Sequence, residues 1–106
     1  MADNSTIRVK AKKKSDFIEV KALINHPMEN GLHKDQETGN LTPAHFIEEI
    51  ECQLNGQVVM TAVWGGGISK NPYLAFQIKG GKVGDVVAVK WTDNQGKTDE
   101  VAVSVQ

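Results

Sequence analysis

Apolar and polar residues alternate along most of the chain, which is the pattern of β-strands that bury one face. The clearest example is residues 16–25, where Ile18, Val20, Ala22 and Ile24 share one parity and mostly polar residues occupy the other. The His-Pro pair that follows should end the strand, because proline has no N–H to donate to a sheet. This segment therefore predicts a strand whose aliphatic side faces a core.

Six further segments show strand character and are separated by glycine-, asparagine- and aspartate-containing turns. They cover residues 6–10, 46–54, 58–64, 73–79, 86–92 and 100–106. The glutamates of 46–54 also suit a helix, but Asn55-Gly56 is a favoured hairpin turn and a strong strand follows it, so we expect a strand. Glu48 lies on the apolar parity there, a conflict that a β-bulge would remove. About seven short strands predict an all-β protein, an antiparallel immunoglobulin-like sandwich.

Residues 58–64 are apolar on both parities, reading Val-Val-Met-Thr-Ala-Val-Trp. A strand with one solvent-facing side should alternate, so this pattern predicts cover on both faces, with a partner protein on the outer one. The alternative is a central strand that tolerates a few exposed valines. If a partner covers it, Val59 and Val63 are candidate interface residues, together with Asn71 and Pro72 in the next loop.

The chain has 106 residues, which fits one domain over residues 1–106. Its net charge of −1 provides no overall basic excess, so we expect no nucleic-acid binding. Basic residues do gather near the N-terminus, and we expect a solvated strand end there, with an anionic partner or membrane surface as the alternative. This group comprises Arg8, Lys10, Lys12, Lys13 and Lys14.

Taken alone, the residues predict a cytoplasmic protein. Cys52 is the single cysteine, which excludes an internal disulfide and suits a reducing compartment. Residues 1–14 lack the apolar stretch of a signal peptide. No apolar run approaches the roughly 20 residues of a membrane span, so no membrane segment is expected.

The chain shows no set of residues with catalytic or metal-binding spacing. His26, His33 and His45 do not have a spacing that places two of them on one face, so we expect loop or surface histidines and no metal or cofactor. Cys52 lies mid-strand on the apolar parity, which predicts a buried and unreactive thiol. The alternative is a metal-dependent enzyme that uses the histidines and Glu29.

Several sequence blocks, taken in order, carry a family resemblance. They include His26-Pro27-Met28-Glu29-Asn30-Gly31, Lys34-Asp35, Pro43-Ala44-His45-Phe46-Ile47, Ser69-Lys70-Asn71-Pro72, Lys79-Gly80-Gly81-Lys82 and Trp91-Thr92-Asp93-Asn94. No block is specific alone, but the ordered set resembles the SoxZ family, a subunit of the SoxYZ carrier of bacterial thiosulfate oxidation. The resemblance runs from about residue 7 to the end.

The resemblance implies a non-catalytic sandwich that binds SoxY in a heterodimer or higher heteromer and contacts other Sox enzymes transiently. In this family SoxY carries the sulfur substrate on a cysteine near its flexible C-terminal tail. This chain ends Val103-Ser104-Val105-Gln106, and Cys52 is mid-chain, so neither matches the carrier cysteine. The resemblance also implies a periplasmic protein exported with the signal-bearing SoxY, which overrides the cytoplasmic prediction.

The sequence also suggests where the carrier cysteine would shelter. Residues 28–43 form a long polar connection, and connections of this length are often functional. We expect this loop and residues 65–72 to border a cleft that shelters the cysteine-bearing tail of SoxY. The candidate cleft-bordering residues are His26, Met28, Glu29 and Asp35. A free-standing binding module of the same fold remains an alternative, and an isolated subunit could self-associate through an uncovered apolar face.

Overall fold

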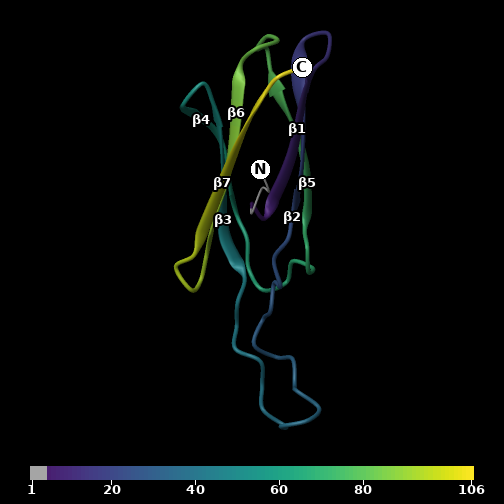
Figure 1. Ribbon diagram of the computed structural model, residues 1–106, viewed down its shortest axis with the longest axis vertical. Coiled ribbons are helices and arrows are strands. Elements are labelled where there is room, and N and C mark those ends of the chain that lie inside the picture. Colours follow the sequence, from purple (N-terminus) through teal and green to yellow (C-terminus); the bar gives the residue numbers. More distant parts are fainter. Residues whose placement is uncertain (1–4) are drawn as a thin grey trace.

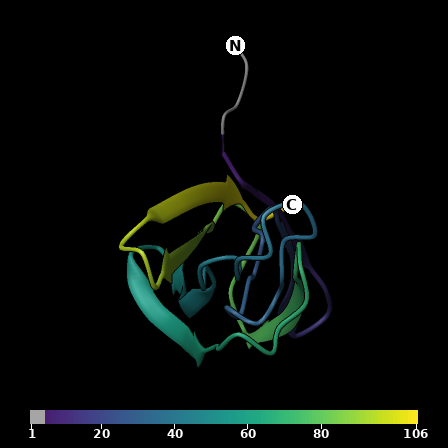
Figure 2. The ribbon, with the colours of Figure 1, turned by 90° about the horizontal axis from the view of Figure 1, so that it is seen from below.

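The computed structural model describes residues 5–106, which form two antiparallel β-sheets facing each other (Figures 1 and 2). The described residues contain seven strands and no helix, so the predicted all-β sandwich is confirmed. The strands are β1 (Ile7–Lys13), β2 (Phe17–Ile24), β3 (Ile47–Leu54), β4 (Gln57–Val63), β5 (Tyr73–Lys79), β6 (Val86–Asp93) and β7 (Thr98–Ser104). No helix in this part of the chain could cross a bilayer.

The two sheets differ in size and meet along one corner. One sheet has the order β1-β2-β5 and the other has the order β4-β3-β6-β7. Strand β1 lies beside β7 where the sheets meet, and β4 and β5 are the edge strands away from this corner. Among the described strands, β4 pairs with β3 alone, so its other edge is unpaired.

The core lies between the sheets and is made of the inward parity of each strand. Strand β2 supplies Ile18, Val20, Ala22 and Ile24, all fully buried as the alternation predicts. The opposite sheet contributes Ile50, Cys52, Val87, Val89 and Trp91 to the same core. Burying each large aliphatic side chain contributes roughly 1.5–3 kcal/mol, so these layers account for most of the stabilisation of the fold.

The β3–β4 hairpin follows its sequence closely. Asn55 and Gly56 both have positive φ, at 52° and 84°. A two-residue type I′ hairpin turn requires positive φ at both of its central residues. The pairing of β3 with β6 shifts between Ile47 and Glu49, so the bulge predicted at Glu48 is confirmed and the Glu48 side chain is exposed.

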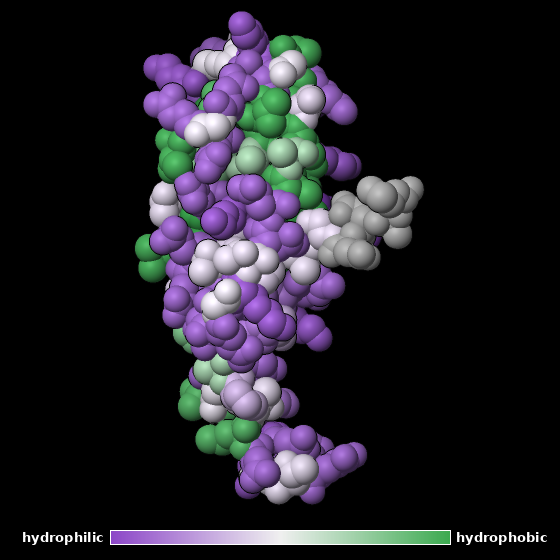
Figure 3. Space-filling view, turned by 60° about the vertical axis from the view of Figure 1, so that its left-hand side comes forward, coloured by the Kyte–Doolittle hydropathy of each residue, from purple (hydrophilic) through white to green (hydrophobic). Residues whose placement is uncertain are grey.

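A long loop leaves one end of the sandwich and extends the molecule to 53 Å in its longest dimension (Figure 1). We call residues 27–45 the arm. Two isolated antiparallel bridges, Glu29 with His45 and Lys34 with Leu41, hold its two limbs together. Leu32 and Leu41 are 77% and 60% exposed. Figure 3 shows apolar surface in green on the arm, between the sandwich and a hydrophilic tip.

The loop between β4 and β5 packs against the root of the arm. A Cβ on Gly66 would lie 2.7 Å from the Cβ of Asn30, so a side chain at this position would collide with the arm. The Asn71 N–H also donates to the His26 carbonyl at 2.9 Å. The two loops expected to border a cleft therefore lie side by side at the same end of the sandwich.

Candidate functional site

Two histidines and an aspartate converge at the root of the arm. His26 follows β2, His45 precedes β3, and Asp93 is the last residue of β6. The Nε2 atoms of His26 and His45 lie 3.1 Å and 2.8 Å from the same oxygen, Asp93 Oδ2. His26 and Asp93 are almost completely buried, and the His45 side chain is 22% exposed. The cluster thus joins three segments that are distant in sequence.

The Asp93 carboxylate accepts four hydrogen bonds. Oδ1 receives the backbone N–H groups of Gln95 and Lys97, at 3.0 Å and 2.9 Å, and Oδ2 receives the two histidines. Burial opposes ionisation of this carboxyl group, but the donors outweigh it and lower the pKa of Asp93 below its ordinary value. Asp93 is therefore a buried anion whose charge is held by hydrogen bonds.

The hydrogen bonds of His26 determine its tautomer. The backbone N–H of Met28 points at Nδ1 from 3.1 Å, so Nδ1 must be the unprotonated acceptor. Nε2 then carries the proton and donates it to Asp93. Burial lowers the pKa of His26, and the hydrogen bond to Asp93 only partly opposes this, so the ring stays neutral. The His26 and Trp91 rings make a T-shaped contact at a centroid distance of 5.0 Å.

These three residues also have donor types that bind metals, and their ligand atoms lie within 4.8 Å of one another. A cation at Nε2 of His26 would force the ring proton onto Nδ1, where the Met28 N–H already points. The donor set therefore fits a hydrogen-bonded lock between segments better than a metal site. The alternative of a metal-dependent enzyme would use all three histidines with Glu29, but His33 and Glu29 are not among the three residues that converge here.

The expectation that no two histidines share a site is wrong. His26 and His45 meet at Asp93, with ring centroids 4.6 Å apart, whereas His33 is exposed on the arm. Spacing along the chain could not show this, because the contact depends on the pairing of β3 with β6, which places Ile47 opposite Asp93. The sequence signal that was missed is that both histidines and Asp93 lie directly at strand ends.

The four candidate interface residues fall into two groups. Val63 and Val59 on β4 are 82% and 43% exposed, so their side chains are open to a partner. Asn71 instead supports its own chain, since its Oδ1 accepts the His26 N–H at 3.1 Å. Pro72 is buried, and its carbonyl accepts the Ile24 N–H at 3.0 Å. The outer surface of β4 is thus the stronger interface candidate.

The four candidate cleft residues also differ in how deeply they are buried. His26 and Met28 are buried, and Met28 Sδ accepts the Ile47 N–H at 3.3 Å. Glu29 pairs through its backbone with His45, at the root of the arm. Asp35 is exposed near the arm tip, where its carboxylate caps a turn. His26 and Met28 therefore set the shape of the root, and a cleft completed by a partner stays a prediction.

Cys52 matches its predicted environment. The residue is fully buried in the core, and this burial raises the pKa of its thiol to about 11. A thiol with this pKa holds very little thiolate near neutral pH, so it is a poor nucleophile. Cys52 packs in the core and is not placed to carry a substrate.

Comparison with known protein families shows the family to which this chain belongs. The family model described as "Sulphur oxidation protein SoxZ" matches residues 7–104 of the 106-residue chain. The chain belongs to the SoxZ family. A comparison with curated protein sequences gave no match. Membership of SoxZ links the chain to sulfur oxidation, and the matched region includes all seven strands, the arm and the histidine–aspartate cluster.

Proposed function

We propose that this SoxZ chain is the non-catalytic subunit of a SoxYZ carrier, which binds SoxY and helps to present its cysteine-bound sulfur to partner enzymes. Membership of the SoxZ family carries the proposal. Two features of the chain support the division of labour. Its only thiol is buried and protonated, and its buried histidine–aspartate cluster is engaged in holding the arm.

The unpaired edge of β4 is the surface that we propose for SoxY. Val58, Val59 and Val63 are all exposed on this strand, at 49%, 43% and 82%. Exposed valines on an unpaired edge favour association with another chain, because a partner can cover the apolar surface and pair the free backbone groups. A standard interface covers about 800 Å² on each partner, which needs more than one strand. The arm, with Leu32 and Leu41, can supply the remaining area.

The proposal includes the compartment and the wider partners. We propose that the carrier works in the periplasm and that this subunit is exported while bound to SoxY, as the family resemblance implies. Contact with other Sox enzymes is then transient, since each must release the carrier after acting on it.

A binding measurement with matched variants tests the proposal. Val63→Asp places a charge on the proposed interface, whereas Val83→Asp does so in the β5–β6 turn, where Val83 is 65% exposed. We expect V63D to weaken SoxY binding by about tenfold or more, which corresponds to about 1.4 kcal/mol, and V83D to leave it unchanged. Failure of the unaltered chain to bind SoxY would reject the function. Equal binding by V63D and V83D would reject only the β4 surface.

A further inference from the structure

The outer face of the β1-β2-β5 sheet carries a concentrated positive charge. Its exposed basic residues are Arg8, Lys10, Lys12, Lys21 and Lys79, and its one acidic side chain is Glu19. Lys10 lies directly opposite Lys21 in the β1–β2 pairing. Like charges at opposed positions destabilise a sheet. Within residues 5–106, Lys21 with Glu19, at 3.5 Å, is the only lysine–carboxylate ion pair on this face.

The other sheet has an outer face of opposite character. Glu49, Glu51 and Glu100 lie there with Lys90 as the one basic residue, and Lys90 is opposite both Glu51 and Glu100 in the pairing. The net charge of −1 therefore hides two faces of opposite sign. Such an asymmetry favours a partner that approaches the basic face with an acidic surface.

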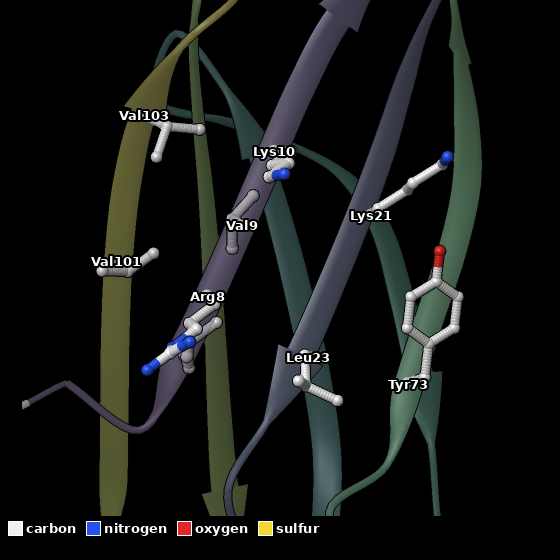
Figure 4. A pocket seen from close by; sticks show the side chains of 9 residues that line it. Arg8, Val9, Lys10, Lys21, Leu23, Tyr73, Val101 and Val103 are labelled. Atoms are coloured by element: carbon white, nitrogen blue, oxygen red, sulfur yellow. The ribbon is translucent and has the colours of Figure 1, made fainter.

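A groove of about 570 Å³ crosses this basic face. Arg8, Lys10 and Lys21 line it, and its apolar wall includes Leu23, Tyr73, Val101 and Val103. Figure 4 shows Val101 and Val103 pointing from β7 toward β1, with Leu23 and Tyr73 on the far side of Arg8 and Lys10. Leu23 and Tyr73 are 46% and 60% exposed. The groove thus offers both cations and uncovered apolar surface.

We propose that this groove docks an acidic segment of a partner protein that also carries apolar side chains. The segment's carboxylates would pair with Arg8, Lys10 and Lys21, and its apolar groups would rest on Leu23 and Tyr73. This surface is distinct from the β4 edge, which belongs to the other sheet. The binding is salt-sensitive, because exposed charges are screened within about 8 Å at physiological ionic strength.

Other occupants fit the groove less well. The acidic face of a second copy carries Val58 and Val63 next to its glutamates, so it has both kinds of group. It is a broad sheet face, however, and a single extended segment enters a groove more readily. A bilayer is flat and cannot enter a concavity. Nucleic acid gains most of its affinity from phosphate contacts, and its phosphates make no favourable contact with an aliphatic wall of this kind.

Nuclear magnetic resonance of the isotope-labelled chain tests the proposal with a defined probe. The probe is a capped heptapeptide that alternates glutamate with leucine, and matched peptides replace glutamate with glutamine or leucine with serine. We expect amide shifts to centre on residues 7–10, 21–23, 73 and 101–103. Both matched peptides should bind at least about fivefold more weakly, since the groove recognises charge and apolar surface together.

One variant separates loss of binding from loss of folding. Lys10→Glu places a carboxylate opposite Lys21, so it should raise the melting temperature while it lowers peptide affinity about tenfold or more. Lys70→Glu, in an exposed loop, is the control and should bind as the unaltered chain does. The proposal is wrong if the glutamine or serine peptide binds equally well, if shifts lie outside the groove, or if K10E binds normally. It is also wrong if single-stranded DNA or phosphatidylglycerol vesicles bind this face more tightly than the probe, or if the chain dimerises through it.

Discussion

Asparagine in place of Asp93 removes the negative charge that four hydrogen-bond donors share. The carboxylate accepts from His26 and His45 on one oxygen, and from the backbone of Gln95 and Lys97 on the other. An amide has one oxygen and one NH₂ group, so its NH₂ group faces either the fixed Nε2–H donor of His26 or the two backbone N–H donors. The shape of the side chain is nearly unchanged, and the perturbation is therefore electrostatic.

The magnitude follows from the number of bonds lost. A hydrogen bond to a charged group contributes about 1.5–3 kcal/mol, and breaking a buried charge network costs about 3–5 kcal/mol. We expect D93N to lower the free energy of unfolding by about 3–5 kcal/mol. Total stabilities are typically about 5–15 kcal/mol, so the variant should stay folded in buffer but melt at least about 15 °C lower.

The same cluster makes stability depend on pH in two windows. The pKa of Asp93 is lowered on folding, so its contribution is present above the unfolded value of about 3.9 and is lost as pH falls through the folded value. The pKa of His26 is also lowered, so the unfolded chain takes up this proton first, and stability falls as pH drops below about 6.5. D93N should lose the Asp93 contribution to the acidic window and keep the histidine window, while Asp99, whose pKa is also lowered by hydrogen bonds, keeps its own acidic contribution.

Urea unfolding at pH 7, followed by tryptophan fluorescence, measures the effect, because Trp91 is in T-shaped contact with His26. Asp35→Asn is the matched control. Asp35 is exposed, and the Glu37 N–H that its Oδ1 accepts at 2.8 Å can equally bond to an amide oxygen, so D35N should change stability by less than about 0.5 kcal/mol. A loss below about 1 kcal/mol in D93N, or equal effects of the two variants, would refute a structural role for the cluster.

Two further predictions concern the core. The Cys52 thiol, with a pKa raised to about 11 by burial, should react with an aromatic disulfide reagent at pH 8 far more slowly in the folded chain than in denaturant; equal rates would contradict its burial. Gly81→Ala should destabilise the chain more than Gly80→Ala, by calorimetry. Both glycines have positive φ, but a Cβ at Gly81 would lie 2.3 Å from Ile18 Cδ1, and a Cβ at Gly80 would meet open space. Similar melting temperatures for the two would argue against this packing.

Much of the fold follows from local pattern. Ile18, Val20 and Ile24 alternate with exposed or partly exposed neighbours, and period-two patterning alone identifies the buried side of β2. Glu48 could be placed in a bulge because a charged side chain cannot lie on a buried parity without a partner. These inferences succeed because each depends on neighbours within a few residues.

The histidine–aspartate cluster and the basic groove could not be predicted from the local sequence pattern. His26 and Asp93 are 67 residues apart, and they meet only because β2 and β6 end at the same end of the sandwich. The basic residues of β1 were visible as a cluster in the sequence. The pairing of Lys10 with Lys21 was not visible, because it depends on the register of two strands. Non-local pairing is the information that the local pattern lacks.

Native mass spectrometry of the chain purified with SoxY, without reductant, tests the central claim most directly. We expect a complex whose mass is the sum of SoxY and this SoxZ chain, or a multiple of that sum. Cys52 should remain a free thiol, since it is buried in the core. Recovery of the two chains only as separate species under native conditions would contradict the proposal that this chain is the SoxY-binding subunit of the carrier.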